Sequence, residues 1–185
     1  SRQALNGLLL EIEGGSATLV GTDGHRLALI NRPVNSQAGK GEKASFLLPK
    51  KALSELLKLL EDDDEKFGFS SHENHLAFIH GTQVIVSRKI DGKFPNYRQV
   101  IPSDNSLKAE VNREDLTHAL KRVSLLADEK SKMVRFEIQK GNLTLISDNT
   151  DLGAAVEEVA IDYKGEEVSI GLNAKYVLDI LNVMD

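Results

Sequence analysis

Three side chains that could take part in catalysis lie close together near the N-terminus: Thr22, Asp23 and His25. A hydroxyl, a carboxylate and a histidine are the residue types of a nucleophile, its general base and the group that orients the base. Residues next to one another on a hairpin rarely reach the mutual geometry that such a mechanism requires, and no second cluster in the sequence complements them. The sequence therefore does not predict an enzyme.

Patterns for binding metals or phosphates are equally weak. The acidic run at 62–65 lacks the alternating ligands and the glycine of a calcium loop and is typical of a solvated turn. His72 and His75 have no helix to align them and no cysteine to join them, which argues against zinc. The Gly-Lys-Gly segment at 39–41 is too short for a phosphate-binding loop and lacks its preceding strand. We expect no metal ion and no cofactor.

The composition favours a soluble globular protein. Of the 185 residues, 41% are apolar and 28% charged, which is enough apolar material for a sizeable core. The absence of cysteine excludes disulfides and is compatible with a reducing cytosol, so we expect a cytoplasmic protein. No apolar run reaches membrane-spanning length, and no signal peptide opens the chain. Since the net charge is −5, any nucleic acid must be bound by positive charge gathered on one face.

The residues around Asp23 are expected to form a hairpin. Strand-forming residues at 17–20 precede it, Leu27, Leu29 and Ile30 follow it, and the Asp-Gly pair between them is a tight-turn signal. Because Gly24 carries no side chain, the backbone beside it stays accessible to a neighbouring molecule. From these residues alone, an ordinary Asp-Gly hairpin without a binding role explains the pattern equally well.

The first half of the chain contains one clear helix among short strands. Lys50 to Glu61 begins after Pro49, a favoured residue at a helix start, and carries an apolar stripe of Leu53, Leu56, Leu57 and Leu60. Strands are expected at 4–13, 44–48, 66–70, 76–79 and 83–88, with a polar loop at 32–41. The proline-rich segment 91–102 predicts a connector between two modules, anchored by its aromatic residues.

The second half repeats this pattern. A helix at 113–127 follows the capping residue Asn112, and a helix at 174–184 follows Asn173. The apolar stripes comprise Leu116, Ala119, Leu120 and Val123 in the first helix, and Val177, Ile180, Leu181 and Met184 in the second. Strands are expected at 107–111, 133–139, 142–147, 154–161 and 168–172.

A strand, a helix and three strands therefore recur, starting near Phe46, Ala109 and Ile170 with a period of about 60 residues. One such unit cannot cover its own sheet, so copies must pack side by side, which predicts an α+β fold with the polar helix faces aligned. Those faces carry Lys50, Lys51, Lys58, His118, Lys121 and Arg122. Basic residues on the outer side of a helix are, taken alone, typical of a solvated face.

Four motifs together resemble one family, the bacterial replicative sliding clamps that serve as β subunits of DNA polymerase III. They are Leu5–Gly7, Thr22–Ala28, Asp91–Tyr97 and Tyr176–Asp179, and the likeness runs along essentially the whole chain. The resemblance implies a DNA clamp fold of repeated β-α-β-β-β units, with helices on the inner face and antiparallel sheets outside. It implies a middle domain at 1–102 and a third domain at 103–185, each truncated, so that we expect a piece of a longer polypeptide.

The family is a non-catalytic processivity factor, in which two protomers of three domains each close head to tail around duplex DNA. By this resemblance the residues facing DNA would be Lys50, Lys51, Lys58, Lys121 and Arg122. Such contacts touch phosphates and carry no sequence information, so binding should be weak and sensitive to salt. Without a first domain, the piece by itself should neither encircle nor retain DNA.

The resemblance also implies a groove for short peptides from the polymerase α subunit, the clamp loader and repair proteins. Its wall would comprise Arg2, Leu5, Thr22, Gly24, His25, Arg26, Leu27, Pro95 and Val100. Leu5, Leu27, Pro95 and Val100 would receive an apolar anchor, while Thr22 and Arg26 would supply hydrogen bonds.

The sequence departs from the family pattern at three places. Gln99 stands where some members carry arginine, Gln3 and Ala4 replace aromatic residues, and C-terminal residues that complete the groove are absent. A peptide-binding adaptor without a DNA role is the alternative reading, and it would not require aligned lysines on the helices.

Overall fold

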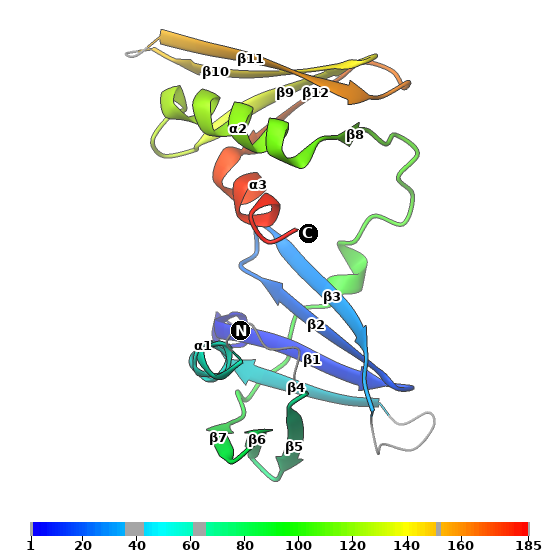
Figure 1. Ribbon diagram of the computed structural model, residues 1–185, viewed down its shortest axis with the longest axis vertical. Helices are drawn as coiled ribbons and strands as arrows, with labels where there is room; N and C mark the ends of the chain where they lie inside the picture. The colour runs from blue at the N-terminus through cyan, green and yellow to red at the C-terminus, as the bar shows by residue number, and fades with distance from the viewer. Residues whose placement is uncertain (1, 36–42, 61–65, 151–152, 185) are drawn as a thin grey trace. The chain divides into compact units, whose positions relative to one another are not determined.

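The computed structural model describes residues 2–35, 43–60, 66–150 and 153–184, except for the side chains of Arg2 and Gln3. The chain divides into two compact units, Ser1–Ile101 (unit 1) and Pro102–Asp185 (unit 2), which Figure 1 colours from blue to green and from green to red. Among the described residues, no helix is long and apolar enough to cross a membrane.

Unit 1 contains a four-stranded antiparallel sheet in the order β3-β2-β1-β4. Its strands are β1 (Gly7–Glu13), β2 (Ser16–Thr22), β3 (Leu27–Pro33) and β4 (Lys43–Pro49). The predicted hairpin is confirmed, because β2 pairs with β3 up to Thr22 and Leu27, and residues 23–26 form the loop. The polar loop predicted at 32–41 lies largely outside the described residues.

The first strand is shorter than predicted. Residues Arg2–Asn6 form a 3-10 helix (η1), and β1 begins only at Gly7. Ala4 is completely buried in a cluster with Leu9 and Tyr97, and this tertiary packing overrides the strand-like alternation of the sequence. Glycine is required at position 7, because a Cβ atom there would lie 2.2 Å from the backbone oxygen of Leu48 on β4.

The helix α1 (Lys50–Leu59) follows β4 directly and shares a core cluster with a small antiparallel sheet. This sheet contains β5 (Gly68–His72), β6 (His75–His80) and β7 (Gln83–Arg88) in sequence order. Leu56 of α1 packs with Leu10, Leu48 and Phe78 in one core cluster.

The apolar stripe predicted for α1 was wrong at Leu57, which is 74% exposed. Ala52 and Leu56 are the buried side chains and mark the centre of the helix face that meets the core. At about 100° per residue, Leu57 lies beyond the edge of that face. Residue 61 and the acidic run 62–65 lie outside the described residues.

The connector predicted at 91–102 is largely irregular, with one short 3-10 turn (η2, Tyr97–Gln99). Its aromatic residues anchor it as predicted. Tyr97 is 5% exposed within the cluster formed by Ala4, Leu9, Val20 and Leu47, and Phe94 packs against the same cluster.

Unit 2 contains a five-stranded antiparallel sheet in the order β12-β9-β10-β11-β8. Its elements are β8 (Glu110–Val111), α2 (Arg113–Val123), a 3-10 turn η3 (Ser124–Leu126), β9 (Met133–Gln139), β10 (Asn142–Asn149), β11 (Gly153–Asp162), β12 (Val168–Asn173) and α3 (Ala174–Leu181). Figure 1 shows α2 and α3 on the same face of this sheet. Their apolar sides and the inward side chains of the strands form one core cluster.

The helices of unit 2 begin where predicted but end earlier. The side chains of Asn112 and Asn173 accept hydrogen bonds from backbone N–H groups in the first turn of α2 and α3, so both predicted caps are confirmed. All four predicted stripe residues of α2 are buried. In α3, Leu181 is buried, but Ile180 and Met184 are 47% and 50% exposed, because Ile180 lies about a third of a turn from the buried face and the helix ends before Met184.

The predicted order of a strand, a helix and three strands is present in both units. It occurs as β4-α1-β5-β6-β7 in unit 1 and as β8-α2-β9-β10-β11 in unit 2, where β12 and α3 begin another copy. The strand predicted at 107–111 is reduced to the two residues of β8.

Candidate functional site

The hairpin loop between β2 and β3 is held by the side chain of Asp23. Its Oδ1 atom accepts hydrogen bonds from the backbone N–H groups of His25 and Arg26, each 3.0 Å long, and its Oδ2 atom accepts one of 3.0 Å from Nε of Arg26. The His25 and Arg26 backbone bonds, followed by the Arg26 side chain, lower the pKa of Asp23. The carboxylate is therefore a structural element of the loop, and it stays ionised at neutral pH.

Thr22 closes the same loop from the other side. Its hydroxyl donates to the backbone oxygen of Arg26 at 2.7 Å and accepts from the N–H of Gly24 at 3.1 Å. Gly24 has a φ of 91°, a left-handed conformation that favours glycine. The hydroxyl of Thr22 therefore stabilises the loop, while its role in orienting a bound peptide stays a prediction.

The predicted peptide-binding residues come from three segments of unit 1: η1, the hairpin and the connector. Leu27 packs against the cluster that contains Ala4 of η1 and Tyr97 of the connector, so the structure gathers the three segments around one core cluster. Leu5 and Leu27 are half-buried, whereas Pro95 and Val100 are exposed, with Val100 at 68%. We call the four side chains Leu5, Leu27, Pro95 and Val100 the apolar surface.

Among the described side chains, the remaining members of the predicted groove do not belong to the core cluster. Gly24, His25 and Arg26 are exposed at the tip of the hairpin. Arg2 belongs to η1, but its side chain lies outside the described part of the structure. The grouping of these residues into one peptide-binding surface stays a prediction.

Sequence reasoning missed Glu11, which fixes the connector to the sheet. Glu11 as a whole is 8% exposed. Its carboxylate accepts hydrogen bonds from the Tyr97 hydroxyl at 2.7 Å and from Nη2 of Arg98 at 2.6 Å, and it forms an ion pair of 3.1 Å with Lys43. Burial tends to raise the pKa of Glu11, but the hydrogen bonds from Tyr97, Lys43 and Arg98 outweigh it and lower the pKa. Strand alternation could have indicated that Glu11 is buried, since Glu11 lies two residues after Leu9 and therefore on the same face of the sheet.

The predicted DNA-facing residues of unit 1 are Lys50, Lys51 and Lys58 on α1, and all three are exposed. Lys51 and Lys58 are seven residues apart and therefore lie on the same side of the helix. Nζ of Lys58 forms an ion pair of 3.0 Å with Glu55, one turn away. Exposed pairs of this kind are weak and can be exchanged for another anion.

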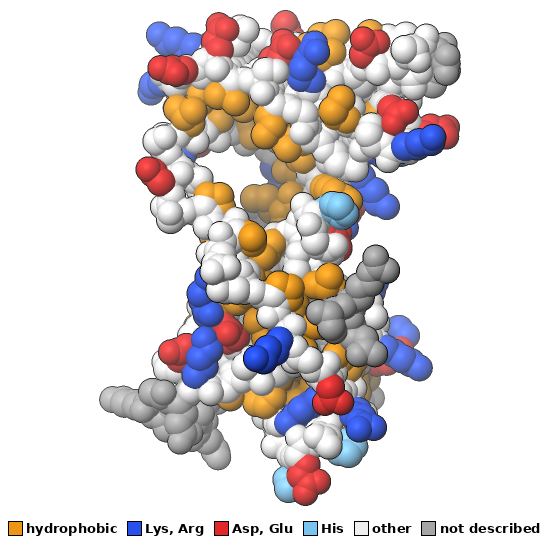
Figure 2. All heavy atoms as spheres, turned by 180° about the vertical axis from the view of Figure 1, so that it is seen from behind, with side chains coloured by type: hydrophobic (Ala, Val, Ile, Leu, Met, Phe, Trp, Pro, Cys, Tyr) orange, Lys and Arg blue, Asp and Glu red, His pale blue; other side chains and the backbone are white. Residues whose placement is uncertain are grey.

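The two predicted residues of unit 2 differ from each other. Lys121 is exposed on α2, whereas Arg122 forms a two-pronged pair with Glu157 of β11, with Nε–Oε1 and Nη2–Oε2 distances of 2.7 Å. This hydrogen-bonded pair raises the pKa of Arg122 and lowers that of Glu157. Arg122 would have to leave a carboxylate before it could contact a phosphate. On the face shown in Figure 2, basic and acidic side chains are interspersed.

Comparison with known proteins identifies the family. Residues 1–96 match the central domain of the DNA polymerase III beta subunit, and residues 98–185 match its C-terminal domain. A beta sliding clamp of Haemophilus influenzae is 36% identical over 184 residues, which cover 100% of this chain and 50% of the relative. The chain spans about half the length of the curated relatives it matches.

Solved structures agree with this result. The DNA polymerase III subunit beta of Pseudomonas aeruginosa is 34% identical and superposes with a TM-score of 0.92, covering 98% of this chain and 50% of that one. A sliding clamp of the same organism bound to griselimycin gives a TM-score of 0.91 at 34% identity, with 98% and 49% covered. The fold is thus that of the bacterial sliding clamps, as the sequence predicted. The chain belongs to the DNA polymerase III beta subunit family.

Proposed function

We propose that this chain supplies the middle and third domains of a sliding clamp, a processivity factor that encircles duplex DNA as a ring of two copies. The observation that carries this proposal is the ordered match of the central domain at 1–96 and the C-terminal domain at 98–185 to one family. The ring would tether the replicative polymerase, the clamp loader and repair proteins to DNA in the cytoplasm, and it would perform no chemistry of its own.

Contact with DNA would come from the helices. Lys50, Lys51 and Lys58 of α1 and Lys121 of α2 are exposed cations that could neutralise phosphates without reading bases. A sliding protein requires such contacts, because they bind every position along the duplex equally. The overall charge of −5 keeps the remaining surface from adhering to DNA.

Partner proteins would bind at the apolar surface beside the hairpin. A leucine or phenylalanine side chain of a peptide would lie against Leu27 and Leu5, with Pro95 and Val100 at its border. The griselimycin complex of the Pseudomonas aeruginosa clamp supports the proposal that this chain also binds that ligand. A measurement of griselimycin binding to the chain would test whether the apolar surface binds a ligand.

A salt titration tests the proposed DNA contact. Fluorescence anisotropy with a labelled 20-base-pair duplex should show weak binding, and the logarithm of the association constant should fall linearly with the logarithm of salt concentration. The slope should be about −0.9 per phosphate neutralised. Duplexes of unrelated sequence should bind equally. Tight binding, a preference for one sequence or an absence of salt dependence would contradict the proposal.

A peptide-binding adaptor without a DNA role is the second candidate. Two observations favour it: Lys58 is paired with Glu55, and Arg122 is paired with Glu157. These pairs reduce the positive charge that the helices offer. The adaptor would bind griselimycin and show no measurable affinity for duplex DNA, even at low salt.

A further inference from the structure

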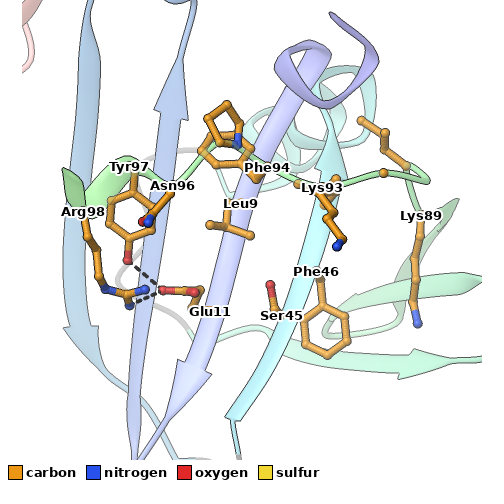
Figure 3. A pocket seen from close by; sticks show the side chains of 14 residues that line it. Leu9, Glu11, Ser45, Phe46, Lys89, Lys93, Phe94, Asn96, Tyr97 and Arg98 are labelled. Carbon is orange, nitrogen blue, oxygen red and sulfur yellow. Dashed lines mark hydrogen bonds and ion pairs between the residues drawn. The ribbon is translucent and has the colours of Figure 1, made fainter. Parts of the chain in front are cut away.

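A cavity of about 420 Å³ in unit 1 lies between β1, β4 and the segment 89–98 (Figure 3). This volume is in the range of sites that accommodate a few side chains of a ligand. Leu9 and Phe46 contribute apolar surface to it, and Phe94 contributes an aromatic ring from the connector. Apart from Pro95, it shares no lining residue with the predicted peptide groove.

Positive charge dominates the lining of this cavity. Lys89, Lys93 and Arg98 contribute three cations, against the single carboxylate of Glu11. That carboxylate is already satisfied by Tyr97 and Arg98 within the lining and by Lys43 outside it. The charge remaining in the cavity is therefore complementary to an anionic ligand.

Lys93 is the cation that is available for such a ligand. Lys89 is engaged, since its Nζ donates to the backbone oxygen of Glu73 at 2.5 Å and lies 5.4 Å from the centroid of the Phe46 ring. Lys93 is exposed and has no hydrogen-bond or ion-pair partner among the described residues. In Figure 3 the ammonium group of Lys93 and the hydroxyl of Ser45 point into the same space.

The cavity also borders an open strand edge. β4 is the last strand of its sheet, and the backbone N–H of Ile90 donates to the oxygen of Leu47 on the side away from β1. Because alternate residues of a strand direct their N–H and C=O groups to the same side, Ser45 presents its backbone groups next to that bond. Within the described residues, no strand pairs with Ser45 on this side. Such an edge is a template for an added strand.

We propose that this cavity is a second binding site, which takes an acidic peptide segment in an extended conformation. The segment pairs its backbone with Ser45 at the edge of β4 and places a carboxylate at Lys93. An apolar side chain two residues from the carboxylate, and so on the same face of the added strand, packs against Leu9 and Phe94. The site lies within unit 1, and the inference does not depend on the proposed clamp function.

The direct test is fluorescence anisotropy with a labelled peptide of sequence Leu-Ser-Glu-Ser-Val, in which the apolar residues lie two positions from Glu and share its face. The same peptide with Gln in place of Glu should bind about fivefold more weakly, the effect of one exposed ion pair. A peptide of unchanged charge that carries N-methyl groups on alternate backbone amides should lose binding, because it cannot pair with the strand edge.

Two variants of the protein complete the test. Lys93→Ala should weaken binding of the Glu peptide about fivefold. Lys140→Ala should leave it unchanged, because Lys140 is an exposed lysine of unit 2 that is not among the residues lining the cavity. Both replaced side chains are exposed, so thermal unfolding should show both variants folded.

Three results would overturn the proposal. Equal affinity for the Glu and Gln peptides would show that the cavity does not select an anion. Equal affinity for the N-methylated peptide would show that no strand is added. If inorganic phosphate displaced the peptide at equal concentration, the site would be a simple anion site and not a peptide site.

Discussion

The Tyr97 hydroxyl donates a 2.7 Å hydrogen bond to Oε2 of Glu11, although the two residues are 86 positions apart in the sequence. Glu11 belongs to β1 and Tyr97 to the connector, so this bond attaches the connector to the sheet. Both partners are nearly buried, and removal of one leaves the other without its partner in a site with little water.

We expect substitution of either partner to destabilise unit 1. Tyr97→Phe should lower the free energy of unfolding by about 1 kcal/mol, and Glu11→Ala by about 1–3 kcal/mol, because the latter also leaves Arg98 without its carboxylate. Urea unfolding of both single variants and the double variant gives the coupling energy. Additive effects would contradict a direct interaction, since residues in contact couple by about 0.5–3 kcal/mol.

The same carboxylate should make stability depend on pH. The pKa of Glu11 is lower in the folded protein than the value of about 4.3 expected for an unfolded chain. Its stabilising contribution is therefore complete above the unfolded pKa and is lost as the pH falls through the folded pKa.

Unfolding should be measured at pH 7 and pH 3 for the natural chain, for Glu11→Gln and for Glu13→Gln, an exposed carboxylate on the same strand. The natural chain should lose more stability between these pH values than Glu11→Gln does. If Glu11→Gln lost as much as the natural chain, the ionised form of Glu11 would not be the source of the stabilisation.

From the ion pair between Arg122 and Glu157 we predict how a substitution of Glu157 changes the affinity for duplex DNA. If Arg122 reaches phosphates, Glu157 competes with the DNA for it, so Glu157→Gln should strengthen duplex binding by about twofold to fivefold at low salt. Glu137→Gln removes a carboxylate from another strand of the same sheet and is the control. Equal increases in both variants would show that only the net charge matters.

We predict that a charged residue in the apolar surface removes ligand binding while the chain stays folded. Val100→Asp should abolish griselimycin binding without unfolding the chain, because Val100 is 68% exposed. Leu27→Asp should have the same effect on binding but also reduce stability, since Leu27 packs against the core cluster. Val84→Asp, on β7 and 58% exposed, is the control. Isothermal titration calorimetry measures all three, and undiminished affinity of Val100→Asp would exclude this surface.

Local patterns explain how much of the fold was predictable. The bounds of β9 were predicted to the residue, and the α2 stripe was buried as expected, because strand alternation and helical spacing are local properties of a sequence. The bond between Glu11 and Tyr97 and the pair of Arg122 with Glu157 depend on tertiary contacts that no local pattern encodes. The same holds for η1, whose conformation follows from the burial of Ala4.

The candidate site was predicted mainly through resemblance. The Asp-Gly hairpin could be derived from the residues, but the grouping of Leu5, Leu27, Pro95 and Val100 could not, since nothing in their spacing brings three separate segments together. The use of the Thr22 hydroxyl within its own loop was also unpredictable, because it depends on the loop conformation around Gly24.

The central claim is that the lysines of α1 hold duplex DNA through its phosphates. The most direct test is the salt dependence of duplex binding for a triple variant, Lys50→Ala, Lys51→Ala and Lys58→Ala, against a control in which Lys132, Lys140 and Lys164 of unit 2, all exposed, become alanine. We predict that the slope of the triple variant is smaller in magnitude by about 0.9 for each lost phosphate contact, whereas the control keeps the natural slope. An unchanged slope in the triple variant would contradict the account.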